Sequence, residues 1–149
     1  MKQQVKKQNN KGFSLVELII VIAIMAILAG ALAPQLIKYL DKARKATDVQ
    51  TAQTIATAVN AALADEKAYA AAADTALANC TSAGNDFQKA IAEVIGSTPP
   101  KPKFDSSTIK DFHIDVQSDN TFKIYTGPAA LGTPDDKNLL YPTVGDNYK

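Results

Sequence analysis

The chain of 149 residues contains one cysteine, one histidine and no tryptophan. A lone Cys80 excludes an intrachain disulfide, a redox pair and a thiolate metal cluster. One cysteine and one histidine also argue against a zinc site. Glycine-rich phosphate loops and EF-hand spacing are absent, and nothing resembles a Ser-His-Asp arrangement. The sequence therefore predicts a protein that is not an enzyme and has no cofactor, bound metal or small-molecule substrate.

Acidic residues are missing from residues 1–12, which contain four lysines: Lys2, Lys6, Lys7 and Lys11. Removing these four from the 16 basic residues leaves 12 against 15 acids, so the rest of the chain has a formal charge of −3. The chain is thus a short basic segment followed by a mildly acidic body. Such a body lacks the large basic field that nucleic-acid-binding proteins present.

One long apolar run follows the lysines. Phe13–Ala33 spans 21 residues, of which only Ser14 and Glu17 are strongly polar. As an α-helix the run would be about 31 Å long, enough to cross a bilayer core of about 30 Å. The lysines ahead of it predict that the N-terminus stays in the cytoplasm. Small residues within it, which let another helix approach closely, are Ala23, Ala26, Ala29, Gly30 and Ala31.

Pro34 and Glu17 are the unusual residues of this segment. Pro34 removes a backbone donor, so a kink or a locally unwound turn is expected there. A carboxylate in an apolar run is costly in lipid and usually functional. A plain transmembrane anchor explains the length and the lysines but not Glu17. A secretory signal peptide cut after Ala31-Leu32-Ala33 is a further alternative, although its apolar part would be longer than usual and Pro34 would follow the cut.

The residues at the start of the run resemble a processing motif. Lys11-Gly12-Phe13-Ser14-Leu15-Val16-Glu17-Leu18 is similar to the prepilin motif of type IV pilins and the related pseudopilins. The resemblance implies that a membrane peptidase cuts between Gly12 and Phe13, and that the new terminal Phe13 is N-methylated. It also matches Glu17 to the family's glutamate and Pro34 to its helix-distorting proline.

The resemblance also implies a role for Glu17 in assembly. The α-amino group of a freshly cut Phe13 is cationic at neutral pH. Glu17 of an incoming subunit would meet the Phe13 amine of a neighbour, and only the correct axial step would neutralise both charges. The alternative is a glutamate near the end of the helix whose side chain reaches the lipid headgroups.

The function that the resemblance implies is structural. The chain would be a precursor of a type IV pilus subunit, held in the cytoplasmic membrane as a single pass and polymerised into an extracellular helical fibre. Its partners would be other copies of itself, a prepilin peptidase/methyltransferase, a platform membrane protein, an assembly ATPase and membrane lipid before assembly. Alternatives are a pseudopilin of a type II secretion or competence DNA-uptake system, and a membrane-anchored binding protein that never polymerises.

Beyond Pro34 an amphipathic helix is expected over residues 35–80. Apolar residues recur every three to four positions from Leu36 to Leu63, with charged residues on the other faces. The alanine-rich stretch Ala56–Ala78 favours helix but offers little area to bury. The turn cluster that begins at Asn79 should end this helix.

The remaining sequence predicts a short helix and a hairpin. Asp86–Ile95 has one apolar side and is followed by Gly96, a stop signal. Apolar and polar residues then alternate in two runs on either side of a turn at Asp119, which predicts an antiparallel hairpin. Its expected pairs are Val116 with Phe122, Ile114 with Ile124, and Asp115 with Lys123. Leu139–Tyr141 is a candidate third strand, ended by Pro142.

These elements predict an α+β fold of the type IV pilin kind. It would consist of a long N-terminal helix, with its hydrophobic half protruding, and a small antiparallel β-sheet head. The expected divisions are a cleaved leader at 1–12, a transmembrane and filament-core helix at 13–34, an amphipathic helix packed on the head at 35–80, and a globular head at 81–149.

Other chemically active residues have ordinary interpretations. His113 is expected on the polar face of an outer strand, in contact with solvent. Asp135, Asp136 and Asp146 flank a C-terminal loop where some major pseudopilins hold calcium, but a solvated turn is the favoured interpretation. The basic helix face at Lys42–Lys45 is compatible with DNA or anionic lipid, and acids on adjacent subunits are its favoured partners.

Overall fold

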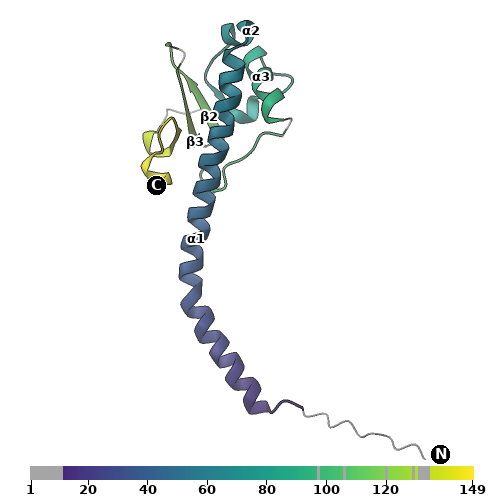
Figure 1. The fold of residues 1–149 in the computed structure, drawn as a ribbon, viewed down its shortest axis with the longest axis vertical. Coiled ribbons are helices and arrows are strands. Elements are labelled where there is room, and N and C mark those ends of the chain that lie inside the picture. Colours follow the sequence, from purple (N-terminus) through teal and green to yellow (C-terminus); the bar gives the residue numbers. More distant parts are fainter. Residues whose placement is uncertain (1–11, 97, 106, 120, 129, 131–134) are drawn as a thin grey trace, which may run out of the picture. The chain divides into compact units, whose positions relative to one another are not determined.

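The computed structural model describes residues 12–96, 98–105, 107–119, 121–128, 130 and 135–149. They form two compact units, one ending at Tyr39 and the other comprising Leu40–Lys149, which we call the folded unit. The elements, shown in Figure 1, are a long helix, two shorter helices and an antiparallel sheet, so the predicted α+β class is confirmed.

Helix α1 (Leu15–Leu63) is the longest element and contributes residues to both units. Its apolar first part consists mainly of Leu, Ile, Val and Ala, and Pro34 lies inside the helix. The helical assignment continues through Pro34 without interruption, so the locally unwound turn is not formed. A proline ring still deprives the helix of one i→i−4 hydrogen bond at that point. The kink at Pro34 stays a prediction.

The expectation of one helix up to residue 80 is wrong, because α1 ends at Leu63. Asp65 caps a separate short helix, α2 (Glu66–Ala70), by accepting hydrogen bonds from the backbone N–H groups of Lys67 and Ala68. The alanines that follow have little side-chain area to hold a helix against the core. Thr75 and Ala76 instead form strand β1 (Thr75–Ala76), and Leu77–Asn79 form a 3-10 turn, η1.

The sheet has four antiparallel strands in the order β1-β2-β3-β4. Strand β2 (Asp111–Val116) pairs with β3 (Phe122–Gly127) in the predicted register, with Val116 opposite Phe122 and Asp115 opposite Lys123. The third predicted strand is also confirmed, as β4 (Leu139–Tyr141). Strand β1 was not predicted, and its pairing makes β2 an inner strand rather than an outer one.

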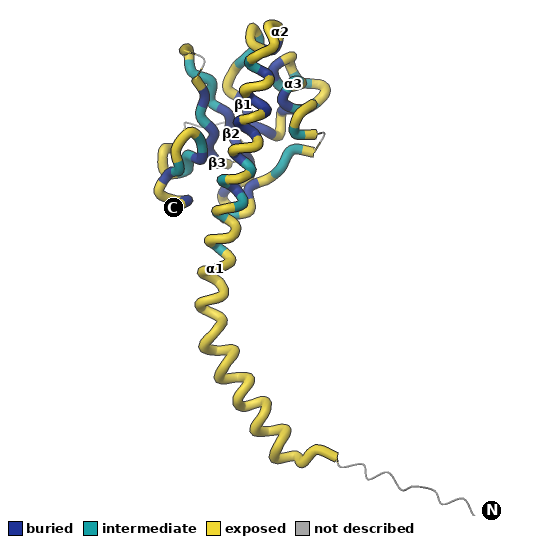
Figure 2. Tube along the Cα trace, in the orientation of Figure 1, coloured by how far each residue is buried: buried dark blue, intermediate teal, exposed yellow. Residues whose placement is uncertain are grey.

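The core of the folded unit lies between the C-terminal part of α1, helix α3 (Asp86–Ile95) and one face of the sheet. Figure 2 shows these surfaces as the buried part of the chain. Helix α3 is formed as predicted and begins with a capping box between Asn85 and Gln88. The fully buried side chains of the core include Ile55, Val59, Phe87, Ile91, Phe112, Ile114 and Ile124.

A buried carboxylate ties the connector after α3 to helix α1. Asp48 is 1% exposed, and its two oxygens accept hydrogen bonds from the backbone N–H groups of Lys103 (2.8 Å) and Phe104 (2.9 Å). The Phe104 ring in turn packs edge-on against Tyr148, near the C-terminus, with ring centroids 5.4 Å apart. Asp48 therefore fixes where the connector crosses α1.

Candidate functional site

The candidate processing site lies where α1 begins. Gly12, Phe13 and Ser14 are exposed and precede the first helical residue, Leu15. The Phe13 side chain is 89% exposed. A Cβ placed on Gly12 would meet no atom within 4 Å, so the fold of this chain does not itself require glycine there. An exposed, non-helical segment of this kind is accessible to a peptidase.

Glu17 has a hydrogen-bond partner within its own chain. Its carboxylate accepts a hydrogen bond from the backbone N–H of Ser14 at 2.9 Å. In return the Ser14 hydroxyl accepts one from the backbone N–H of Val16 at 3.3 Å. The two side chains thus occupy backbone donors that the first helical turn leaves unpaired. No ion pair joins Glu17 to any cation of the described residues.

This capping was not among the features predicted for Glu17. The signal was nonetheless present, because Ser14-Leu15-Val16-Glu17 has the S-x-x-E spacing of a capping box ahead of an apolar run. A glutamate at the third helical position also interacts favourably with the positive end of the helix dipole. Glu17 therefore has a local structural role in the isolated chain, and its predicted role between subunits is additional to it.

The apolar part of α1 is exposed throughout. Among the described residues, α1 is the helix long and apolar enough to cross a membrane, and none of the residues in its most apolar segment is buried. Its large exposed side chains extend from Leu15 to Leu40 and include Ile19, Ile22, Ile24, Leu28 and Leu32. A contiguous apolar surface of this length indicates a membrane or a partner surface.

The comparison with protein families agrees with this site. The family model of the prokaryotic N-terminal methylation motif matches residues 7–33. No curated protein and no solved structure matches the chain significantly. The chain carries the class III signal peptide of the type IV pilin and pseudopilin superfamily, as the sequence analysis predicted. The motif and the apolar helix together fit a membrane-anchored precursor of a pilin-like or pseudopilin-like subunit.

His113 is buried, and the expectation of a solvated side chain is wrong. It is 0% exposed, its ring stacks on Tyr125 with centroids 5.2 Å apart, and its Nε2–H donates to the carbonyl of Pro128 at 2.8 Å. A Cβ on Gly127 would lie 3.2 Å from the imidazole, so glycine makes room for the ring. The error followed from placing β2 at the edge of the sheet. Strand β1 in fact pairs with β2 on that side, with Ala76 opposite His113.

Cys80 is also buried, and burial raises the pKa of its thiol to about 12, with the charge of Asp111 adding to the effect. Such a thiol stays protonated at neutral pH and is a poor nucleophile. The described residues contain no group of three or more histidine, cysteine or acidic side chains that could hold a metal ion.

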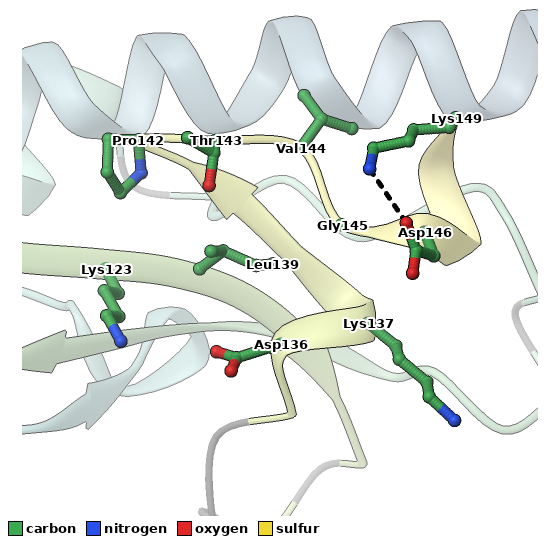
Figure 3. Close-up of a pocket in the computed structure, with 10 residues that line it drawn as sticks. All are labelled: Lys123, Asp136, Lys137, Leu139, Pro142, Thr143, Val144, Gly145, Asp146 and Lys149. Carbon is green, nitrogen blue, oxygen red and sulfur yellow. Dashed lines mark hydrogen bonds and ion pairs between the residues drawn. The ribbon is translucent and has the colours of Figure 1, made fainter.

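Asp136 and Asp146, near the C-terminus, line a hollow of about 420 Å³ (Figure 3), and Asp135 precedes it in the chain. Asp146 pairs with Lys149 at 2.8 Å, and this lysine lowers the pKa of the carboxyl. Asp135 caps the 3-10 turn η2 (Asp136–Asn138) by accepting from the backbone N–H of Lys137 at 3.0 Å. Both acids thus have local partners, which favours turn stabilisation.

Proposed function

We propose that this chain is the precursor of a structural subunit of a type IV pilus. The lysines before Gly12 hold the N-terminus in the cytoplasm, and the apolar part of α1 stores the subunit in the membrane as a single pass. Cleavage between Gly12 and Phe13 frees an amine that is then methylated. The cleaved subunits polymerise into a helical extracellular fibre through their apolar helices.

One observation carries the proposal: the methylation motif at residues 7–33 coincides with the exposed apolar surface of α1. Such a surface is unfavourable in water, so it needs lipid before assembly and other copies of itself afterwards. Small residues such as Ala26 and Gly30 would let neighbouring helices approach closely in the bundle. A Cβ on Gly30 would meet no atom of its own chain within 4 Å, which leaves that position open to a neighbour.

The local bond of Glu17 supports a change of partner on assembly. In the precursor its carboxylate accepts from the neutral backbone N–H of Ser14. The cationic amine of a cleaved Phe13 on an adjacent subunit is a stronger partner for it, because a full positive charge adds a charge–charge attraction that the neutral N–H lacks. Subunits that are correctly offset would form this bond, and others would leave the carboxylate with its neutral partner only.

The partners follow from this route. A prepilin peptidase/methyltransferase would process Gly12 and Phe13, and a platform membrane protein with an assembly ATPase would move subunits from lipid into the fibre. The same motif and helix also serve a pseudopilin of a type II secretion or competence system, which would form a short pseudopilus. Immunogold electron microscopy separates these two, because only a pilus subunit labels long fibres at the cell surface.

The test is the intact mass of the chain recovered from its native host. We expect a 137-residue product that begins at Phe13 and carries one additional methyl group. A product that retains its lysines, or one that begins at Pro34 after a signal-peptide cut, would contradict the proposal.

A further inference from the structure

Charge is distributed unevenly over the folded unit, and one end of it is basic. We call this end the basic collar; its residues are Lys42, Arg44, Lys45, Lys101 and Lys103. The first three lie on α1, and the other two lie on the connector that Asp48 binds through Lys103 N and Phe104 N. Lys45 Nζ sits over the Phe104 ring, 4.8 Å from its centroid, which also holds the two segments together.

The acids beside the basic collar are already engaged. Asp48 is buried on its two backbone N–H donors. Asp41 lies 3.6 Å from Arg44, and Asp105 accepts a hydrogen bond from the Ser107 hydroxyl at 2.6 Å. The charge of Lys101 also acts on the buried Asp111, a fourth nearby acid. Five cations against four acids leave a formal excess of +1. Between the segments is a hollow of about 530 Å³, lined by Arg44, Lys103, Asp105 and Ser107.

The opposite end carries an acidic tip, formed by Asp74, Asp115 and Asp119 around the turn between β2 and β3. Asp74 accepts from the backbone N–H of Val116 at 2.8 Å, which holds it beside Asp115. Burial, and then the charge of Asp74, raise the pKa of the Asp115 carboxyl, while Lys123 across the strand pair lowers it. The Asp74 and Asp115 side chains therefore lie side by side at this end of the sheet.

The basic collar and the acidic tip lie at opposite ends of the folded unit. The connector meets α1 at Asp48, whereas α1 ends at Leu63, fifteen residues later or about 22 Å along the helix. Figure 1 shows the turn between β2 and β3 near the α2 end of the unit, away from the connector. The two surfaces therefore cannot neutralise each other within one molecule.

We propose that the acidic tip of one copy docks on the basic collar of the next copy in the fibre. This contact joins two different surfaces, so it does not close on itself as a two-fold dimer does, and repetition yields an open chain. Complementary charge fixes the partner and the register, while like-charged ends are excluded. The inference rests on the proposed function, because it names a contact within the same fibre.

Cysteine cross-linking in fibres tests the contact directly. A chain with both Lys103→Cys and Asp119→Cys, treated with a short bismaleimide, should yield a ladder of covalent multimers. Each single variant should yield no ladder, since one thiol per chain cannot extend beyond a dimer. Cys80 is 1% exposed and stays out of the reaction. The matched control pairs Lys137→Cys with Asp119→Cys, because Lys137 is exposed but outside the basic collar, and it should remain monomeric.

Charge reversal gives a second, independent measurement. Arg44→Glu with Lys103→Glu should lower the yield of sheared fibres at least about tenfold, and Lys137→Glu should leave it unchanged. Adding Ser118→Lys, at an exposed residue of the turn, should restore part of the yield.

Intact fibres with no ladder and no effect of the reversal would overturn the inference but not the proposed function. Loss of binding to anionic vesicles with normal fibres would assign the basic collar to lipid and also overturn it. Absence of fibres from the unmodified chain would contradict the proposed function itself.

Discussion

The two parts of helix α1 differ in burial, and the order is opposite to their hydrophobicity: the more apolar part is the exposed one. Residues from Leu15 to Leu40 are mostly large aliphatic side chains, and all the large ones are exposed. From Asp48 to Ala62 the helix contains many alanines, yet this is the part that is buried. A chain that folded by itself in water would bury its largest apolar side chains first. The contrast indicates that the first part is built to be covered by something outside the chain.

The largest expected effect concerns the processing site. Gly12→Leu should abolish cleavage, so that all of the product keeps its N-terminal lysines, as intact mass would report. The fold gives no steric reason for this loss, because a Cβ at Gly12 meets nothing within 4 Å. Gly30→Ala is the matched control, with an equally open surrounding in the chain, and its cleavage should be normal. Normal processing of Gly12→Leu would contradict the proposed cut.

The next largest expected effect is on fibre yield after substitution of Glu17. Two substitutions distinguish the role of its hydrogen bond in capping the helix from the role of its charge. Glu17→Gln keeps an oxygen that can accept from Ser14 N–H. Glu17→Ala loses this bond and the interaction of the charge with the helix dipole, at a cost of about 0.3–1 kcal/mol in helix stability. Both should be cleaved normally, and both should reduce fibre yield at least about tenfold, because each lacks the charge. If Glu17→Gln assembles like the unmodified chain, the residue acts only as a helix cap.

A pair of isoleucine truncations compares the two parts of α1 directly. Ile55 is 0% exposed and Ile27 is 72% exposed. In detergent, Ile55→Ala should lower the free energy of unfolding by about 2–5 kcal/mol, and Ile27→Ala should change it by less than about 0.5 kcal/mol. Urea titration measures both. Equal losses would mean that the exposed part of α1 is buried within the chain after all.

The smallest expected effect is a pH dependence at Asp48. Burial raises the pKa of this carboxyl, even though the Phe104 and Lys103 N–H groups and the Lys103 charge lower it. The folded chain therefore binds this proton more tightly than the unfolded chain does. The stability that Asp48 contributes is present below the usual carboxyl range and is lost as the pH rises through the raised pKa. Asp48→Asn should flatten the fall in unfolding free energy as the pH rises above the usual carboxyl range. An unchanged slope would show that other groups cause the fall.

Much of the fold follows from local sequence patterns, and the errors lie where those patterns are weak. Alternating residues fixed the register of β2 and β3, because apolar and charged pairs agreed on one alignment. The alanine-rich stretch after Leu63 misled the prediction, since alanine favours helix locally but supplies little area for packing. The strand at Thr75 has only two residues, too few for any periodicity, and missing it also placed His113 in solvent.

The motif of the candidate site could be predicted from the sequence, the roles of its residues stay predictions, and its contacts could not be predicted. Gly12, Phe13 and Glu17 were chosen from a motif of adjacent residues, which sequence comparison detects well. The bond between Asp48 and the connector joins residues 55 and 56 positions apart, and no local pattern announces it. The α1 residues of the basic collar were already predicted as a basic helix face, but the connector lysines beside them became visible only in the structure.

The central claim is that the apolar part of α1 is shared between copies of this chain. It is tested most directly by thiol accessibility at Ala26→Cys in sheared fibres, with Lys137→Cys as an exposed control. The account predicts that the thiol at residue 26 resists a water-soluble maleimide, while the control thiol is labelled freely. Free labelling of both thiols in intact fibres would contradict it.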